Sequence, residues 1–178
     1  MSFTVTATQA GGTHNGMALC VKVLTGAAAI QNGTTASSIS TTTPDDPTFT
    51  PAATGSWVYG AVVNGSSSTA YTPASGTTFE ANVSDTTNTC VYGAFRTTST
   101  TTSGTPITVG ATAPTGTAGF IDEAIAEILA ASGQTLAESA SAPAVASTFT
   151  ATTVSTAAFA PPAGSLLVAM VATDTSGA

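Results

Sequence analysis

The chain of 178 residues is long enough for one domain and a remainder, and with 42% hydrophobic residues it can build a core. Charged residues make up only 6%, against about 25% in ordinary globular domains, and the net charge is −7. Lys22 and Arg96 are the only basic side chains, which excludes binding dominated by nucleic-acid phosphates. Few charges with many Thr, Ser, Gly and Ala are typical of β-rich surface and assembly proteins.

Targeting signals are not visible in the sequence. The first residues lack the basic start and apolar run of a signal peptide, and no apolar stretch approaches the ~20 residues of a membrane span. We therefore expect a protein that has no membrane partner.

Two strands are predicted near the N-terminus. Residues 3–8 alternate Thr with apolar side chains, and residues 17–24 alternate again, which is the period-two pattern of a strand. In the second strand one face carries Leu19, Val21 and Val23, and the other carries Cys20, Lys22 and Leu24. The Ser/Thr-rich residues 31–47 are expected to form a flexible or edge connection.

The most apolar stretch, residues 57–63, is predicted to be a central strand buried on both faces. A Pro-Ala-Ala-Thr-Gly-Ser turn precedes it, and Asn64-Gly65 ends it with the chemistry of a hairpin turn. The phenylalanine, the turn and the apolar strand of residues 49–63 recur at residues 159–171. The sequence therefore contains an internal structural echo.

Residues 77–83 and 90–97 are the next predicted strands. The first alternates Phe79, Ala81 and Val83 with Glu80 and Asn82. The second repeats the Val-Tyr-Gly-Ala of the central strand, so that Gly60 and Gly93 occupy equal places. Glycine inside a strand marks a bulge or the close approach of another element.

Two readings stay open for residues 120–129. The spacing of Ile121, Ala124, Ile125, Ile128 and Leu129 fits a helix, whereas the place of the segment at the end of an all-β module favours a closing strand. Residues 107–111 are a short predicted strand before it.

The C-terminal third is predicted to lie outside the first module. Residues 1–133 are expected to form the β-sandwich, 134–147 a linker, and 148–178 an arm or a partial second β-module. Two or three strands cannot bury a core alone. Either the sequence is cut short, or these strands pair with another domain or chain, for which we expect a neighbouring copy.

No catalytic, cofactor or metal site can be argued from the sequence. His14 is the only histidine and stands in a turn-rich stretch without ligand partners, so it is expected to be solvated. Asp45 and Asp46 lack the loop of a calcium site, and no nucleophile motif or phosphate-binding loop occurs. We therefore expect a protein that is not an enzyme.

Three weaker possibilities are weighed. Cys20 and Cys90 form either a disulfide or, as we favour without an export signal, two buried thiols. Trp57, Tyr59, Tyr71 and Tyr92 form either a sugar-stacking platform or, as we favour, part of the core. Lys22, Asn82 and Glu80 form either a covalent Lys–Asn cross-link site or, as we favour, an ordinary solvated lysine.

Four segments together resemble a group of actinobacteriophage structural proteins of the minor capsid or minor tail type. They are GMALCVKVLTGAAA at residues 16–29, FTPAATGSWVYGAVVN at 49–64, LAESASAPA at 136–144 and FAPPAGSLLVAMVATD at 159–174. The resemblance implies an all-β, antiparallel β-sandwich of jelly-roll or concanavalin-like type, and brings no catalytic residues.

The function that follows is an expectation. It is a virion structural protein, most simply a capsid decoration or minor capsid protein that docks on the major capsid protein or on other virion proteins. We favour a homo-oligomer, a trimer above all, that is assembled in the host cytoplasm and located in the virion. The alternative is a tail-associated host-recognition or carbohydrate-binding module.

Overall fold

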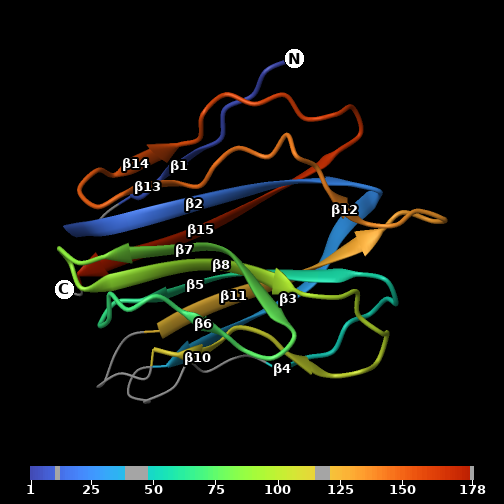
Figure 1. Cartoon of the computed structure of the whole chain (residues 1–178), viewed down its shortest axis with the longest axis horizontal. Coiled ribbons are helices and arrows are strands. Elements are labelled where there is room, and N and C mark those ends of the chain that lie inside the picture. Colours follow the sequence, from blue (N-terminus) through green and yellow to red (C-terminus); the bar gives the residue numbers. More distant parts are fainter. Residues whose placement is uncertain (11–12, 39–47, 115–120, 177–178) are drawn as a thin grey trace.

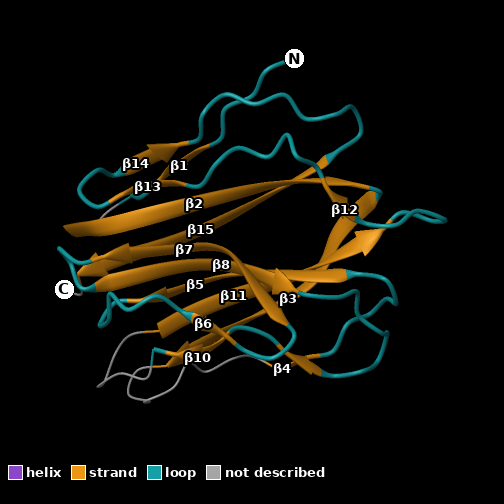
Figure 2. Cartoon of the chain, viewed as in Figure 1, coloured by secondary structure: helices purple, strands orange, loops and turns teal. Residues whose placement is uncertain are grey.

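The computed structural model describes residues 1–10, 13–38, 48–114 and 121–176, and the strands of this part of the chain form two central sheets (Figure 1). Every strand pair in it is antiparallel, and it contains strands and loops without a helix (Figure 2). The predicted all-β, antiparallel β-sandwich is confirmed. The jelly-roll or concanavalin-like subtype stays a prediction.

The first sheet has five strands. Its order is β3 (Ala27–Ser38), β11 (Ile121–Ala130), β5 (Trp57–Asn64), β8 (Cys90–Thr97) and β7 (Thr77–Asp85). The two predicted central strands, β5 and β8, pair with each other inside this sheet.

The second sheet is organised around one long strand, β2 (Thr13–Thr25). One edge of β2 pairs with β15 (Leu166–Ser176), and the other pairs with β12 (Ala137–Glu138) and β13 (Ala146–Thr148). β2 lies over β8 and β7, and β15 lies over β5 and β8. The inner face of each sheet is the one that packs against the other sheet.

Short strands cover the outer faces of both sheets. β1 (Thr6–Thr8) and β14 (Thr153–Ser155) form an outer lid with Phe159 over β2. Over the outer face of the five-stranded sheet lie β4 (Thr48–Phe49), β9 (Ile107–Thr108), β6 (Thr72–Pro73) and β10 (Ala111–Ala113). Because of these covers, β2 and β5 carry buried residues on both of their faces. The sequence predicts this for the central strand β5.

Gly60 and Gly93 lie on the outer face of the five-stranded sheet, where aromatic rings pack directly over them. A side chain at Gly60 would collide with the Phe95 ring, and one at Gly93 would meet Phe79 at 2.6 Å. These rings belong to the neighbouring strands, since Gly60 pairs with Phe95 and Phe79 lies on β7. The predicted close approach at both glycines is confirmed, and its cause is aromatic packing.

Residues 121–130 form strand β11, which settles the choice between helix and strand. β11 pairs with β3 on one edge and with β5 on the other, so its backbone groups are bonded across the sheet. Ile121 and Ile125 belong to the apolar cluster on the outer face of the five-stranded sheet, which we call the outer cluster. Ile128 belongs to the apolar cluster between the two sheets, which we call the inner cluster. The isoleucine spacing that resembles a helix arises because β11 is apolar on both faces.

The structure changes two expectations about connections. Residues 27–38 form β3, an edge strand that pairs with β11, so the predicted flexible or edge connection at 31–47 begins as a paired edge strand, and its residues 39–47 lie outside the described residues. Residues 134–147, predicted as a linker, contain β12 and the start of β13, both bonded to β2. Leu136 in this stretch is buried in the inner core.

The expected arm is also corrected. β15 pairs with β2 of the same chain from Leu166 to Ser176, and β14 pairs with β1. Val168, Met170 and Ala172 are buried between the sheets. The echo of residues 49–63 at 159–171 therefore supplies the second sheet of one sandwich, and the division at residues 133 and 147 does not match the strand pairing.

A chain that ends at Gly133 is expected not to fold. It lacks β12 to β15, so both edges of β2 and the apolar inner face of the five-stranded sheet are exposed to water. Urea unfolding followed by circular dichroism tests this, with a chain that ends at Ser176 as the folded control. A cooperative transition in the shorter chain would contradict the expectation.

Candidate functional site

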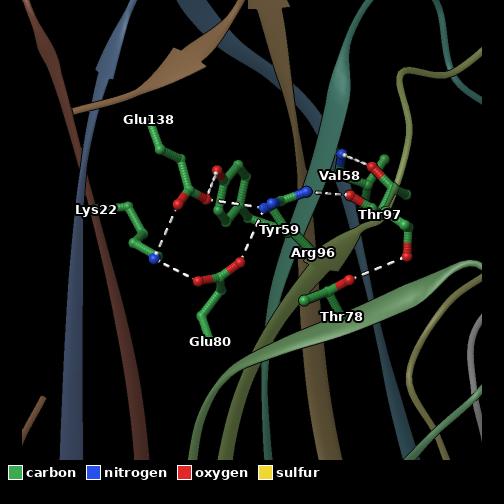
Figure 3. A network of polar contacts seen from close by, with 9 residues as sticks. Lys22, Val58, Tyr59, Thr78, Glu80, Arg96, Thr97 and Glu138 are labelled. Carbon is green, nitrogen blue, oxygen red and sulfur yellow. Dashed lines mark hydrogen bonds and ion pairs between the residues drawn. The ribbon is translucent and has the colours of Figure 1, made fainter. Parts of the chain in front are cut away.

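The two basic residues of the chain meet two glutamates between the sheets (Figure 3). Lys22 comes from β2 and Glu138 from β12 of the second sheet, while Glu80 comes from β7 and Arg96 from β8 of the first. Each sheet thus contributes one cation and one anion. We call these four residues the ion cluster.

Every carboxylate of the ion cluster touches both cations. Lys22 Nζ contacts Glu80 Oε2 and lies 3.0 Å from Glu138 Oε2. Arg96 Nε lies 2.9 Å from Glu80 Oε1 and 2.8 Å from Glu138 Oε1. The Tyr59 hydroxyl donates a further hydrogen bond of 2.8 Å to Glu138. The four side chains are only 12–24% exposed, so most of their surface is removed from water.

A β-bulge aims Glu80 into the ion cluster. Phe79 pairs with Phe95 and Ala81 pairs with Ala94, so Glu80 is an extra residue on β7. Phe79 packs in the outer cluster while Ala81 packs in the inner one. Ala81 and Val83 share the inner face as predicted, but Phe79 does not share it, because the bulge between Phe79 and Ala81 shifts the pattern by one residue.

The contacts of the ion cluster favour the charged forms of its members. Burial acts to lower the pKa of Lys22, but the hydrogen bonds and charges of Glu80 and Glu138 outweigh it and raise that pKa. Burial acts to raise the pKa of Glu138, but the Tyr59 hydroxyl, Lys22 and Arg96 together lower it. The cluster therefore favours a charged Lys22 amine beside a charged Glu138 carboxylate, which opposes amide formation by Lys22.

Replacing Lys22 by Met is expected to lower the free energy of unfolding by about 2–3 kcal/mol. Hydrogen bonds to charged groups are worth about 1.5–3 kcal/mol, and partial exposure keeps the loss below that of a fully buried pair. Urea unfolding at neutral pH measures the change. Lys22→Met combined with Glu80→Gln keeps the cluster neutral and should recover part of the loss; a double variant as unstable as the sum of both single variants would show no coupling.

Acid should weaken the same cluster. Because the pKa of Glu138 is lowered on folding, its contribution is complete above the ordinary value of 4.5 and is lost as the pH falls through the lowered value. The melting temperature of the wild type should therefore fall more steeply below pH 4.5 than that of Glu138→Gln. Parallel curves for the two proteins would contradict this origin.

A second buried polar group closes the turn before β5. The fully buried Glu127 of β11 accepts hydrogen bonds from the Ala52 and Ala53 backbone N–H groups at 2.9 and 3.1 Å, and from the Ser56 hydroxyl at 2.6 Å. Thr101 Oγ1 lies 2.5 Å from Ser56 Oγ. All of these bonds satisfy the turn itself, so Ser56 is held as a structural residue.

The four aromatic residues weighed as a sugar platform do not form an exposed surface. Tyr59, Tyr71 and Tyr92 are at most 4% exposed, and Tyr71 faces the outer cluster while Tyr59 faces the inner one. Trp57 is half-buried, which corrects the expectation of a core residue, and the Arg96 guanidinium lies 4.8 Å from its ring centroid. Trp57 and Tyr59 share a face as predicted, with centroids 6.2 Å apart.

The other candidate residues are not brought together. Asn82 bonds to the backbone of Tyr71 on the outer face, away from Lys22, so the Lys–Asn cross-link has no geometric basis. His14 belongs to β2, but its side chain lies outside the described residues, as do Asp45 and Asp46. Within the described ranges, no three metal-ligating side chains gather, and no helix is long and apolar enough to cross a membrane.

Cys20 and Cys90 are two free, buried thiols that lie in different clusters. Burial raises the pKa of Cys20 to about 11. Burial and a hydrogen bond to Asp174 raise the pKa of Cys90 to about 12. The prediction of two buried thiols in place of a disulfide is confirmed.

Neither thiol should react with a thiol reagent at pH 8 while the protein is folded, because the nucleophilic thiolate is scarce and enclosed. Ellman's reagent should count two thiols only after unfolding in guanidinium without a reductant. Cys20→Ala serves as the one-thiol control. A zero count after unfolding would mean a disulfide.

An open groove lies beside β15, between it and the exposed inner face of β11. It encloses about 360 Å³, and its lining includes Thr35, Val63, Asp122, Ala124, Val171 and Thr173. We call it the β15 groove. The groove has room for a ligand or a partner segment, and the sequence did not predict it, since its walls come from strands far apart in the chain.

Comparison of the chain with protein-family models, with curated proteins and with solved structures finds no match in any of the three.

Proposed function

We propose that this protein is a structural component of a bacteriophage virion, namely a capsid decoration or minor capsid protein that docks on the major capsid shell. The observation that carries the proposal is where its reactive side chains lie. Both cations are used in the ion cluster, and Glu127 and Ser56 are used in a turn. What remains at the surface is rich in Thr and Ser, and suits contact with protein better than chemistry.

The resemblance of four segments to actinobacteriophage structural proteins supports the same proposal. Their strands now form one sandwich, since residues 16–29 supply most of β2 and residues 159–174 supply most of β15. The alternative of a tail-associated carbohydrate-binding module needs exposed aromatic rings, and no specific observation favours it. We propose a homo-oligomer, with a trimer favoured, as the docking form.

The test is to locate the protein in purified particles produced by the genome that encodes it. Quantitative mass spectrometry and immunogold labelling should find it on the head, in a fixed ratio to the major capsid protein. Light scattering of the isolated protein measures the oligomer. Its absence from particles, or its location on tail tips only, would contradict the decoration role.

A further inference from the structure

The two sheets of the sandwich do not cover each other completely. β2 and β15 lie over β7, β8 and β5, and β15 also approaches β3, but part of β11 and β3 is left uncovered beside β15. Asp122 and Ala124 of β11 are exposed on this inner face, opposite Val63 and Ala61 of β5. Ile30 of β3 pairs with Ile128, shares its face, and is 51% exposed.

The free edge of β15 borders this uncovered face. β15 pairs with β2 on one edge, and no other strand of the described residues pairs with it. Its edge therefore presents alternating N–H and C=O groups to solvent. Neighbouring strands lie about 4.8 Å apart, so a strand added to this edge would lie over β11, on the floor of the β15 groove.

β15 is weakly protected over residues 166–173. This stretch has no Pro and no charged side chain, and Val171 is 41% exposed; the register shift against β2 and the inward-facing Asp174 come only at its end. The edge strand β7, in contrast, carries a bulge at Glu80. The β15 edge is thus open to an incoming strand, which is the geometry of β-strand addition.

Charge identifies the occupant. Asp122 stands exposed at the groove, and both cations of the chain are used in the ion cluster. A second copy would bring the same Asp122, a net charge of −7 and no spare Lys or Arg. We propose that the β15 groove binds an extended segment of a different protein, which adds a strand to β15, rests small apolar side chains on Ala124, and places a Lys or Arg beside Asp122.

The experiment uses the full chain, immobilised, to select from a displayed library of random peptides of about nine residues, a usual strand length. Selected sequences should alternate small apolar and polar residues and carry a Lys or Arg. Their synthetic peptides should bind in solution and slow hydrogen exchange at the amides of β15.

Matched variants locate the binding. Ala124→Lys fills the floor of the groove and should abolish binding, whereas Val145→Lys adds the same charge at a residue that is 36% exposed and outside the groove lining, and should not. Asp122→Asn should weaken binding by about two- to fivefold at low salt, the range of an exposed ion pair. Asp122→Lys paired with a Glu-for-Lys peptide should restore it. Circular dichroism confirms that each variant is folded.

Three results would overturn the proposal. The library yields no peptide above a blank surface; or the selected peptides are indifferent to Ala124→Lys and Asp122→Asn; or the protein self-associates through this face, seen as an oligomer that Ala124→Lys disperses. These readouts are independent of the location of the protein in a virion, so the proposal and the proposed function can fail separately.

Discussion

The pairing of β2 with segments from the far end of the chain is the constraint on which the sandwich depends. β2 spans residues 13–25, and its partners come from residues 137–138, 146–148 and 166–176. The five-stranded sheet, in contrast, is built from residues 27–130 alone. The entropic cost of closing a loop rises only slowly with loop length, so distant pairing lowers the stability of the fold only slightly. Distant pairing does slow folding. All strands of the first sheet are present once the chain reaches residue 130, although β11 pairs with the distant β3 and β5, whereas the second sheet also needs the C-terminal strands.

The ion cluster depends on the pairing of β12 with β2 and forms only in one register of that pairing. Glu138 pairs with Leu24, which places its carboxylate within reach of Lys22 on the inner face of the second sheet. Glu80 reaches the same point only through a bulge in β7. Charges taken from water gain little net stability unless each one is matched. A slip of β12 by one residue would turn Glu138 to the other face and leave Lys22 and Arg96 facing Glu80 alone, so the cluster favours one register.

Strands with a clear local hydrophobic pattern could be predicted from the sequence. Features that depend on contacts with distant segments could not. The strands at residues 17–24, 57–63 and 90–97 stand out because their apolar residues follow period two or run continuously. β3 was missed because its Ala, Thr and Ser side chains carry little hydrophobic signal, and β11 supplies the reason it is a strand. The expected solvated Lys22 is wrong, since its side chain is 15% exposed and pairs with Glu80 and Glu138. The cluster was not predicted because a bulge, which has no sequence signature here, aims Glu80 inward, and because β12 was expected to be a linker.

The internal use of both cations sets how the outside of this protein meets other molecules. The cluster is neutral, so the net charge of −7 is carried entirely by the seven acidic residues outside it. Of these residues, Asp85, Glu123 and Glu127 are buried, whereas Asp122 is exposed beside β15, where it attracts a cationic partner and disfavours a second copy at that edge. An open strand edge on a protein without this charge would pair with its own kind, since backbone hydrogen bonding does not distinguish partners. Charge thus supplies the selectivity that the β15 edge lacks, and it restricts that edge to segments that carry a cation.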